Sequence, residues 1–155
     1  MQTARVAAWL SLPASDVRTV RRVGGGDTAA AYQIQTREGA RFIKTLPAAA
    51  HATLAAEARG LAELHTADAL RVPRVLACGC DQALSWLVLE WLEMRSSSTA
   101  SAAQLGVGLA LLHRTTAASF GFEVHNFIGR SPQTNTPTSR WDTFFATHRL
   151  GTQRT

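Results

Sequence analysis

The chain has few cysteines and no long apolar run, and both features limit the kinds of protein it can be. Only two of its 155 residues are cysteines, Cys78 and Cys80, and they lie too close together to close a stabilising loop. Without further Cys or His at ligand spacing they make a poor zinc site, so reduced thiols are expected. No apolar stretch approaches the roughly 18 residues of a membrane span. The sequence therefore predicts a cytoplasmic protein with no membrane partner.

The basic residues outnumber the acidic ones but are not clustered. The formal net charge is +5, from 16 Lys and Arg against 11 Asp and Glu. A nucleic-acid surface needs basic residues gathered in a patch or stripe, whereas here the arginines are scattered along the chain. We therefore predict no nucleic-acid partner. Binding through net charge alone stays a minor alternative, which would show as steeply salt-dependent retention of DNA or RNA.

Hydrophobic periodicity predicts an α+β fold. Two alternating segments and three further strand-like runs surround one helical pattern, and two more helical patterns follow. We expect strands over 17–23, 31–36, 41–46, 71–79 and 85–94, and helices over 4–11, 51–65, 102–114 and 140–150. Hairpins with one inserted helix favour an antiparallel sheet over a doubly wound parallel one. Residues 119–139 are expected to form a long loop. A polar segment near 93–98 divides the chain into a first lobe, 1–92, and a helical region, 93–155.

One lysine occupies an unusual place in this pattern. In "RFIKTL", residues 41–46, Lys44 shares its strand face with Phe42 and Leu46. Lysines are almost never buried without a partner. On the helix expected over 51–65, Glu57 lies on the apolar stripe formed by Leu54, Leu61 and Leu64. We predict an inward-facing Lys44–Glu57 ion pair. Such pairs add little to stability, which favours a role in ligand binding. The alternative is that Lys44 reaches the sheet edge and Glu57 a helix end.

The order of motifs around this pair is that of a protein-kinase-type nucleotide lobe. A glycine turn, "GGGDT" (24–28), precedes the lysine strand, and "LVLEWL" (87–92) follows the glutamate helix. Glycines let backbone N–H groups approach phosphates, and a lysine neutralises phosphate charge. The segment after the last strand can offer backbone groups to adenine. Taken alone, "GGGDT" is a weak signal, because it is not G-x-G-x-x-G and three glycines more often form a flexible turn.

Longer motifs resemble one family, the fructosamine kinases, also called ketosamine-3-kinases, which are relatives of the aminoglycoside phosphotransferases. The resemblance runs over nearly the whole chain, and its most specific part is "HNFIGRSPQTNT" followed by "WDTFFATHRL". Further matching segments are "GGGDTAAAY", "RFIKT", "AAEARGLAEL", "RVPRVLACG", "SWLVLEWLEM" and "LGVGLALLHR". The resemblance implies a protein-kinase-like fold, with a five-stranded, mostly antiparallel sheet and one helix in the N-lobe, followed by the first helices of a helical C-lobe.

The resemblance also implies an activity and a set of site residues. The activity is phosphorylation, with ATP and Mg²⁺, of the sugar in fructosamine or ribulosamine adducts, on small molecules or glycated proteins. In this sequence the matching nucleotide-binding residues are Gly24, Gly25, Gly26, Asp27 and Thr28 as phosphate loop, Lys44 and Glu57 as ion pair, and Glu90, Trp91 and Leu92 as hinge. Some relatives carry a cysteine in the glycine loop. Asp27 and Thr28 stand there instead, so redox control by a loop thiol is not implied.

The residues that the family uses for phosphoryl transfer are missing. The family pattern has a His-Gly-Asp loop with an Asn a few residues later, supplying the base and metal ligands. This chain contains no His-x-Asp, and only Asp142 follows the hinge, where it begins a helix. We therefore expect no catalytic or metal-binding residue here and no activity from the isolated chain. A complementing C-terminal chain would restore activity. The alternative is a non-catalytic nucleotide- or partner-binding module.

The remaining conspicuous residues have simpler interpretations. We expect Trp141, Phe144 and Phe145 to be core anchors rather than a platform for stacking sugars. Asn126 and Asn135 lie in the long loop, where turn formation explains asparagine without a ligand.

Overall fold

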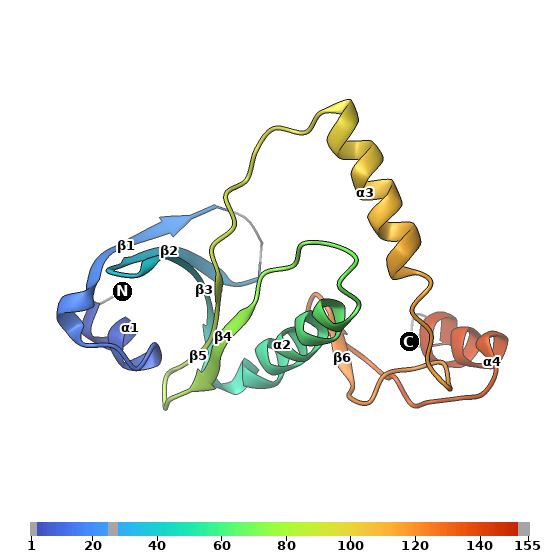
Figure 1. Ribbon diagram of the computed structural model, residues 1–155. Helices are drawn as coiled ribbons and strands as arrows, with labels where there is room; N and C mark the ends of the chain where they lie inside the picture. The colour runs from blue at the N-terminus through green and yellow to red at the C-terminus, as the bar shows by residue number, and fades with distance from the viewer. Residues whose placement is uncertain (1–2, 25–27, 152–155) are drawn as a thin grey trace.

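The computed structural model describes residues 3–24 and 28–151 and contains a five-stranded antiparallel sheet (Figure 1). The strands are β1 (Val17–Val23), β2 (Ala30–Thr36), β3 (Gly39–Pro47), β4 (Val75–Cys80) and β5 (Leu84–Glu90), in the spatial order β1-β2-β3-β5-β4. Every neighbouring pair runs antiparallel, which confirms the predicted α+β class. The strand-like patterns at 17–23, 31–36 and 41–46 all lie within strands of this sheet.

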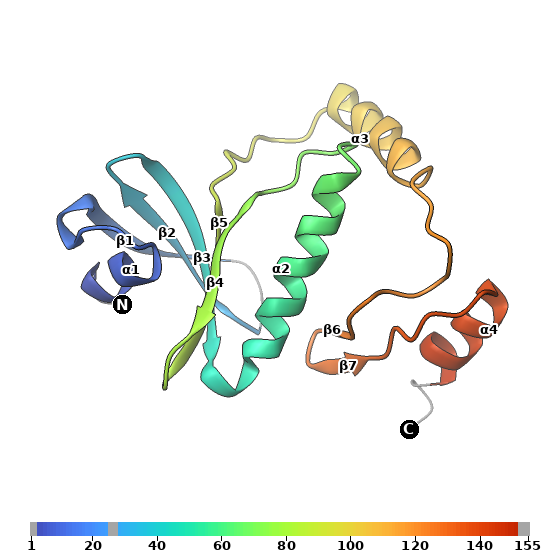
Figure 2. The same ribbon diagram turned by 60° about the horizontal axis from the view of Figure 1, so that its bottom comes forward.

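Helices cover the sheet on both faces (Figure 2). The helix α1 (Thr3–Trp9) packs on one face, where Val6, Trp9 and Ile43 belong to one buried cluster. Trp9 stacks on Trp86 of β5, with ring centroids 4.6 Å apart. The helix α2 (His51–Thr66) packs on the other face through a second cluster built around Leu54, Leu87 and Leu89. Because side chains alternate along a strand, neighbouring residues of β3 face different helices.

Two strands are shorter than the sequence pattern predicted. Strand β4 begins at Val75 rather than at residue 71, since Pro73 has no N–H with which to extend a ladder. Strand β5 ends at Glu90 rather than at residue 94. Glu90 pairs with Arg41 at the end of the β3–β5 register, and its N–H donates to the carbonyl of Arg74 at 2.9 Å. The segment after Glu90 is therefore a connection and not sheet.

The second half of the chain contains α3 (Thr99–Leu112) and α4 (Trp141–Phe145), which continues into a π-helical turn, Ala146–Leu150. Ser98 caps α3 by accepting from the N–H of Ser101 at 3.1 Å. The loop predicted over 119–139 contains a small hairpin, β6 (Asn126–Ile128) and β7 (Ser131–Gln133). Its turn uses Gly129 at φ 61°, a conformation that glycine adopts without strain. Three-residue strands are too short for sequence periodicity to reveal.

The helices in the described part of the chain are all too short or too polar to cross a bilayer. Short 3₁₀ turns, Ala14–Asp16 and Ala48–Ala50, lead into β1 and α2. Both cysteines are free thiols on β4, as the sequence predicted.

Candidate functional site

The predicted Lys44–Glu57 pair is present. The ammonium Nζ of Lys44 donates to both carboxylate oxygens of Glu57, at 2.7 and 2.9 Å. The two side chains are 29% and 32% exposed, so the pair is partly buried and open on one side. The alternative, in which each side chain turns to a separate edge, is wrong. An ammonium has three donors, and two of them are directed at Glu57, which leaves one for a ligand.

Local structure explains why the two charges meet. Lys44 lies in the middle strand of the sheet, paired with Ala31 of β2 and Leu87 of β5. Its side chain therefore leaves the sheet on the face covered by α2. On that helix Leu54 is buried and Leu61 packs against the same cluster, which fixes the side of the helix that carries Glu57. Lys44 is also the only lysine in the chain, and the other 15 basic residues are arginines.

The three predicted hinge residues line a mostly apolar cavity at the end of β5. Glu90, Trp91 and Leu92 border a space of about 340 Å³, together with Phe42 and Gly24. The rings of Trp91 and Phe42 lie 6.4 Å apart at an angle of 35°. A cavity of this size, apolar with a few backbone polar groups, is typical of small-ligand sites. The sequence did not identify Phe42 as a lining residue, although its place beside Lys44 put it on the correct face.

The hinge is held by contacts that the sequence did not indicate. The carboxylate of Glu90 accepts hydrogen bonds from the guanidinium of Arg71 and from the N–H of Arg74, the latter at 3.3 Å. The N–H of Glu90 donates back to the carbonyl of Arg74 at 2.9 Å. Since that N–H is occupied, a ligand at this segment must use other backbone groups.

The two described ends of the glycine turn, Gly24 and Thr28, line different cavities. Gly24 lines the hinge cavity, and Thr28 lines a second cavity of about 390 Å³ that is also bordered by Glu57. The predicted loop residues Gly25, Gly26 and Asp27 lie outside the described residues. The described ends of the turn therefore border the hinge cavity on one side and the Glu57 cavity on the other.

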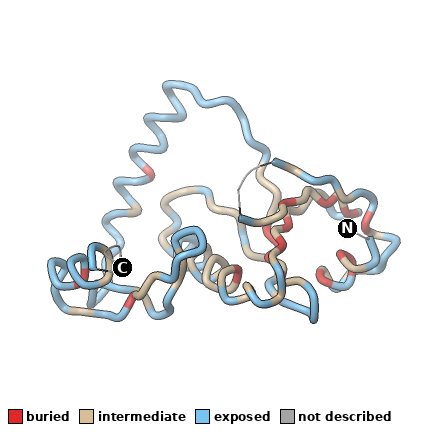
Figure 3. The backbone as a smooth tube through the Cα atoms, turned by 180° about the vertical axis from the view of Figure 1, so that it is seen from behind, coloured by how far each residue is buried: buried red, intermediate tan, exposed pale blue. Residues whose placement is uncertain are grey.

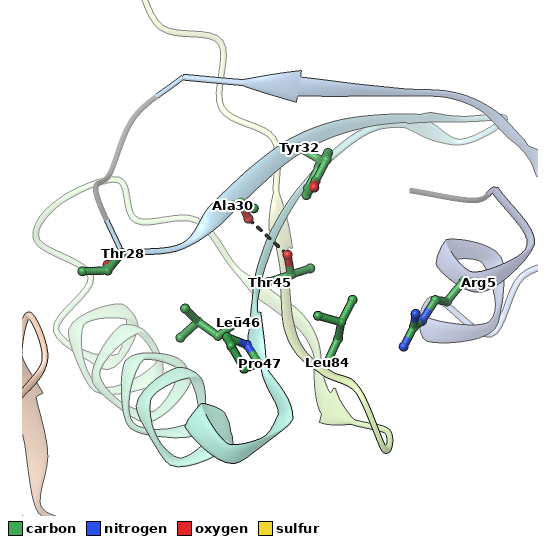
Figure 4. Close-up of a pocket in the computed structure, with 8 residues that line it drawn as sticks. All are labelled: Arg5, Thr28, Ala30, Tyr32, Thr45, Leu46, Pro47 and Leu84. Atoms are coloured by element: carbon green, nitrogen blue, oxygen red, sulfur yellow. Dashed lines mark hydrogen bonds between the residues drawn. The ribbon is translucent and has the colours of Figure 1, made fainter.

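A further cavity, of about 620 Å³, lies beside α1 and reaches the end of β3 at Leu46 and Pro47 (Figure 4). It is lined by Tyr32 and Thr45, and Arg5 of α1 borders it. Thr45 follows Lys44 in β3, so its side chain points away from the ion pair. Arg5 already donates to both carboxylate oxygens of Asp81 at 2.7 Å. Leu46 and Thr28 also line this space, and Thr28 lines the Glu57 cavity as well, so the two cavities are neighbours at Thr28.

Two interpretations of the C-terminal residues need correction. Asn135 is 1% exposed and is a buried cross-link, not a turn residue. Its amide nitrogen donates to the carbonyl of Val124 and to Asn126, and its oxygen accepts from Arg149 at 2.7 Å. Among the three aromatic residues predicted as core anchors, only Phe144 is buried. Both corrections concern long-range packing, which a local pattern does not reveal.

In residues 3–24 and 28–151, no three His, Cys, Asp or Glu side chains are grouped as metal ligands would be. The carboxylate of Asp142 is not free to act as a ligand or base, because it is paired with Arg140. The Arg140 guanidinium, with the N–H of Thr143, holds the pKa of this carboxyl below its usual range. A carboxylate with a lowered pKa is a weaker base.

Comparison with known proteins identifies the relatives of this chain. The family model for fructosamine kinase matches residues 1–155. A Synechocystis protein named as a probable ketoamine kinase is 39% identical over 86% of this chain and 45% of its own length. The Arabidopsis thaliana chloroplastic protein-ribulosamine 3-kinase is 35% identical over 90% of this chain and 44% of its own.

A solved structure from Thermobifida fusca, assigned as a fructosamine-3-kinase, superposes with a TM-score of 0.78 at 31% identity. The match covers 95% of this chain and 50% of that one. The chain thus spans about half the length of the relatives it matches. Its fold is the protein-kinase-like fold expected from the sequence, and the chain belongs to the fructosamine kinase family.

Proposed function

We propose that this chain forms the nucleotide-binding part of a kinase that transfers phosphate from ATP to the sugar of ketosamines. The observation that carries the proposal is the half-open Lys44–Glu57 pair on the sheet face beside the hinge cavity. Fructosamine or ribulosamine adducts, on small molecules or on glycated proteins, are the proposed acceptors, and the cytoplasm is the proposed location. Residues 1–92 would form the nucleotide lobe, and 93–155 the start of the helical lobe.

Each residue has a distinct part in this proposal. Adenine would occupy the cavity lined by Phe42, Trp91 and Leu92, and the phosphates would extend along the glycine turn at 24–28. Lys44 would donate to a phosphate oxygen and neutralise charge, while Glu57 keeps the ammonium in place. Mg²⁺ would neutralise further phosphate charge, and its protein ligands are expected outside this chain.

The transfer step requires a carboxylate that accepts the proton of the attacking hydroxyl. In the described part of the chain, Asp81 is paired with Arg5 and Asp142 with Arg140. We therefore assign the catalytic aspartate to the second half that the relatives possess. A non-catalytic nucleotide-binding module is the alternative, favoured by the same missing base. The discovery of a chain that supplies the base and restores turnover would exclude it.

Thermal unfolding with and without MgATP tests nucleotide binding. At a hundredfold excess over the dissociation constant, a ligand that binds only the folded state stabilises it by about 2.7 kcal/mol. We expect this stabilisation in the native sequence and its loss in Lys44→Ala. Arg59→Ala is the matched control, because it removes a cation paired with Glu123 from the neighbouring part of α2. A melting temperature that MgATP leaves unchanged in the native sequence would contradict the proposal.

A further inference from the structure

The cavity beside α1 has the size and the lining of a second ligand site. At about 620 Å³ it is larger than the hinge cavity of about 340 Å³. Sites for small molecules typically measure about 300–1,000 Å³ and have a mostly apolar lining with a few polar groups. The lining residues lie between positions 5 and 84, and buried segments of the chain gather where α1 meets the sheet (Figure 3). The cavity therefore belongs to the part of the molecule that holds the larger buried cluster.

Arg5 is the one charged residue among the described residues that line this cavity. Within the described part of the chain, its hydrogen bonds to Asp81 use only Nε and Nη2, at 2.7 to 3.2 Å. A guanidinium has five N–H donors on three nitrogens, so Nη1 keeps two of them. Figure 4 shows the Arg5 side chain extending from α1 toward Leu84 of the sheet. The ion pair thus holds the guanidinium in place and leaves a charged donor for a ligand in the cavity.

Two hydroxyl groups in the wall have spare capacity for hydrogen bonds. Thr45 is 6% exposed, and its Oγ1 approaches the carbonyl oxygen of Ala30 only to 3.5 Å. Hydrogen bonds between oxygens are normally about 2.7–2.8 Å long, so this contact is weak. The Tyr32 hydroxyl has no hydrogen-bond partner among the described residues, although its ring packs against the buried cluster beside α1. Because a buried polar group without a good partner is costly, these hydroxyls favour a ligand that is partly polar.

The rest of the lining limits the chemistry of the ligand. Ala30, Pro47 and Leu84 present apolar surface beside the polar groups. The single cation favours an anion, since a hydrogen bond between charged groups is about twice as strong as one between neutral groups. Asp81 already neutralises part of that cation, so a dianion such as a phosphate monoester would retain a charge without a partner. A small acid with one carboxylate and an apolar body matches the lining best.

We propose that the cavity beside α1 is a binding site for a small organic carboxylate, separate from the nucleotide site proposed above. The carboxylate accepts from Nη1 of Arg5 and from the hydroxyl of Tyr32 or Thr45. The apolar body packs against Pro47 and Leu84. No residue of the Lys44–Glu57 ion pair or of the predicted hinge lines this cavity, so binding requires no nucleotide.

The test is a titration of the isotope-labelled chain with benzoate, followed by two-dimensional NMR of the backbone amides. Benzyl alcohol is the matched neutral ligand, because it has nearly the same size and shape but no charge. We expect saturable shifts of the amide signals around Thr45 and Leu84 with benzoate. Benzyl alcohol should bind about tenfold more weakly, since it cannot form a charge-assisted hydrogen bond with Arg5.

Two variants separate ligand binding from the structural role of the ion pair. Arg5→Met and Asp81→Asn both remove the Arg5–Asp81 ion pair, but only the first removes the donor Nη1. Arg5→Met should weaken benzoate binding about tenfold. Asp81→Asn should leave the affinity unchanged or raise it, because a neutral amide competes less with the ligand for the guanidinium. The NMR spectrum of each variant also shows whether it is folded.

Four results would overturn the proposal. Benzoate could cause no saturable shift, or benzyl alcohol could bind equally well, which would mean that the cavity does not recognise an anion. Equal loss of binding in both variants would mean that the ion pair only shapes the cavity. Displacement of benzoate by MgATP would place benzoate in the nucleotide site. The comparison of the two ligands uses the native sequence alone, so it decides the question even if Arg5→Met does not fold.

Discussion

At the scale of single residues, the choice of lysine at position 44 is informative. Arginine supplies every other cation of the chain, so general solubility does not explain this lysine. A guanidinium is a broad planar fork, whereas an ammonium is a compact charge that can donate in three directions. At 44 the ammonium meets both oxygens of Glu57 and keeps one donor for a third group. This geometry suits a phosphate oxygen held next to a carboxylate.

Sequence periodicity could predict this pair but could not predict the contacts around it. Lys44 and Glu57 lie on regular elements, where periods of 2 and 3.6 fix which side chains share a face. The contacts of Glu90 with Arg71 and Arg74, and the buried site of Asn135, depend on irregular segments. Their geometry is set by tertiary packing, for which a local pattern contains no signal.

Asn135→Ala is predicted to destabilise the protein by about 1–3 kcal/mol, because the carbonyl of Val124 and the amide oxygen of Asn126 lose a buried donor. Urea denaturation measures the change. Gln104→Ala, at an exposed position on α3, is the control and should change the free energy of unfolding by less than about 0.5 kcal/mol. Equal stability of the two variants would show that the Asn135 contacts contribute nothing.

At the scale of elements, the sequence predicted which segments are helices and strands better than it predicted where each begins and ends. Long periodic segments such as α2 agree with the pattern to within a residue. The ends of β4 and β5 differ because Pro73 and the Arg74–Glu90 backbone bond stop the ladder, and neither effect changes hydrophobic periodicity. The β6–β7 hairpin was missed because its strands are only three residues long.

Two glycines of α3 provide a matched test of how this helix packs. Gly106→Ala should stabilise the protein by up to about 1 kcal/mol, because alanine favours a helix and nothing lies within 4 Å of the new Cβ. Gly108→Ala should destabilise it, since the new Cβ would collide with Leu70. Thermal unfolding of both variants checks the signs. Stabilisation by both substitutions would mean that α3 does not rest on the loop around Leu70.

The attachment of α1 to the β4–β5 turn should depend on pH. The Arg5 guanidinium, aided by the N–H groups of Leu84 and Ala83, holds the pKa of Asp81 well below its usual range. A carboxyl whose pKa is lower in the folded than in the unfolded state stabilises the fold at any pH above its unfolded-state pKa, which is near 3.9. This stabilisation is lost as the pH falls from there toward the folded-state pKa. We therefore expect Asp81→Asn to flatten the fall of melting temperature below about pH 4. Identical acid profiles for the two proteins would contradict this.

At the scale of the whole molecule, the chain combines a five-stranded sheet flanked by α1 and α2 with helices α3 and α4, whose large apolar side chains are mostly exposed. The sequence correctly indicated the family, since the family motifs extend from the glycine turn to the C-terminal helix. It could not predict how much of α3 is exposed, because an apolar pattern is the same whether or not a partner covers it.

The isolated chain should not turn over substrate. With MgATP and a simple ketosamine such as fructosyl-glycine, a coupled assay should detect no ADP release above the background of a protein-free sample. Addition of the second half of a relative should produce release, because it supplies the aspartate that accepts the hydroxyl proton. Clear turnover by the isolated chain would mean that one of its own residues acts as the base.

The most direct test of the central claim, that Lys44 contacts the phosphates of bound ATP, is covalent labelling with an acyl phosphate of ATP. This reagent transfers its acyl group to an amine next to the bound triphosphate, and Lys44 is the only lysine in the chain. Peptide mass spectrometry should find the label on Lys44, and an excess of MgATP should suppress it while the same concentration of adenosine should not. A Lys44 that stays unlabelled, or labelling that MgATP does not reduce, would contradict the account.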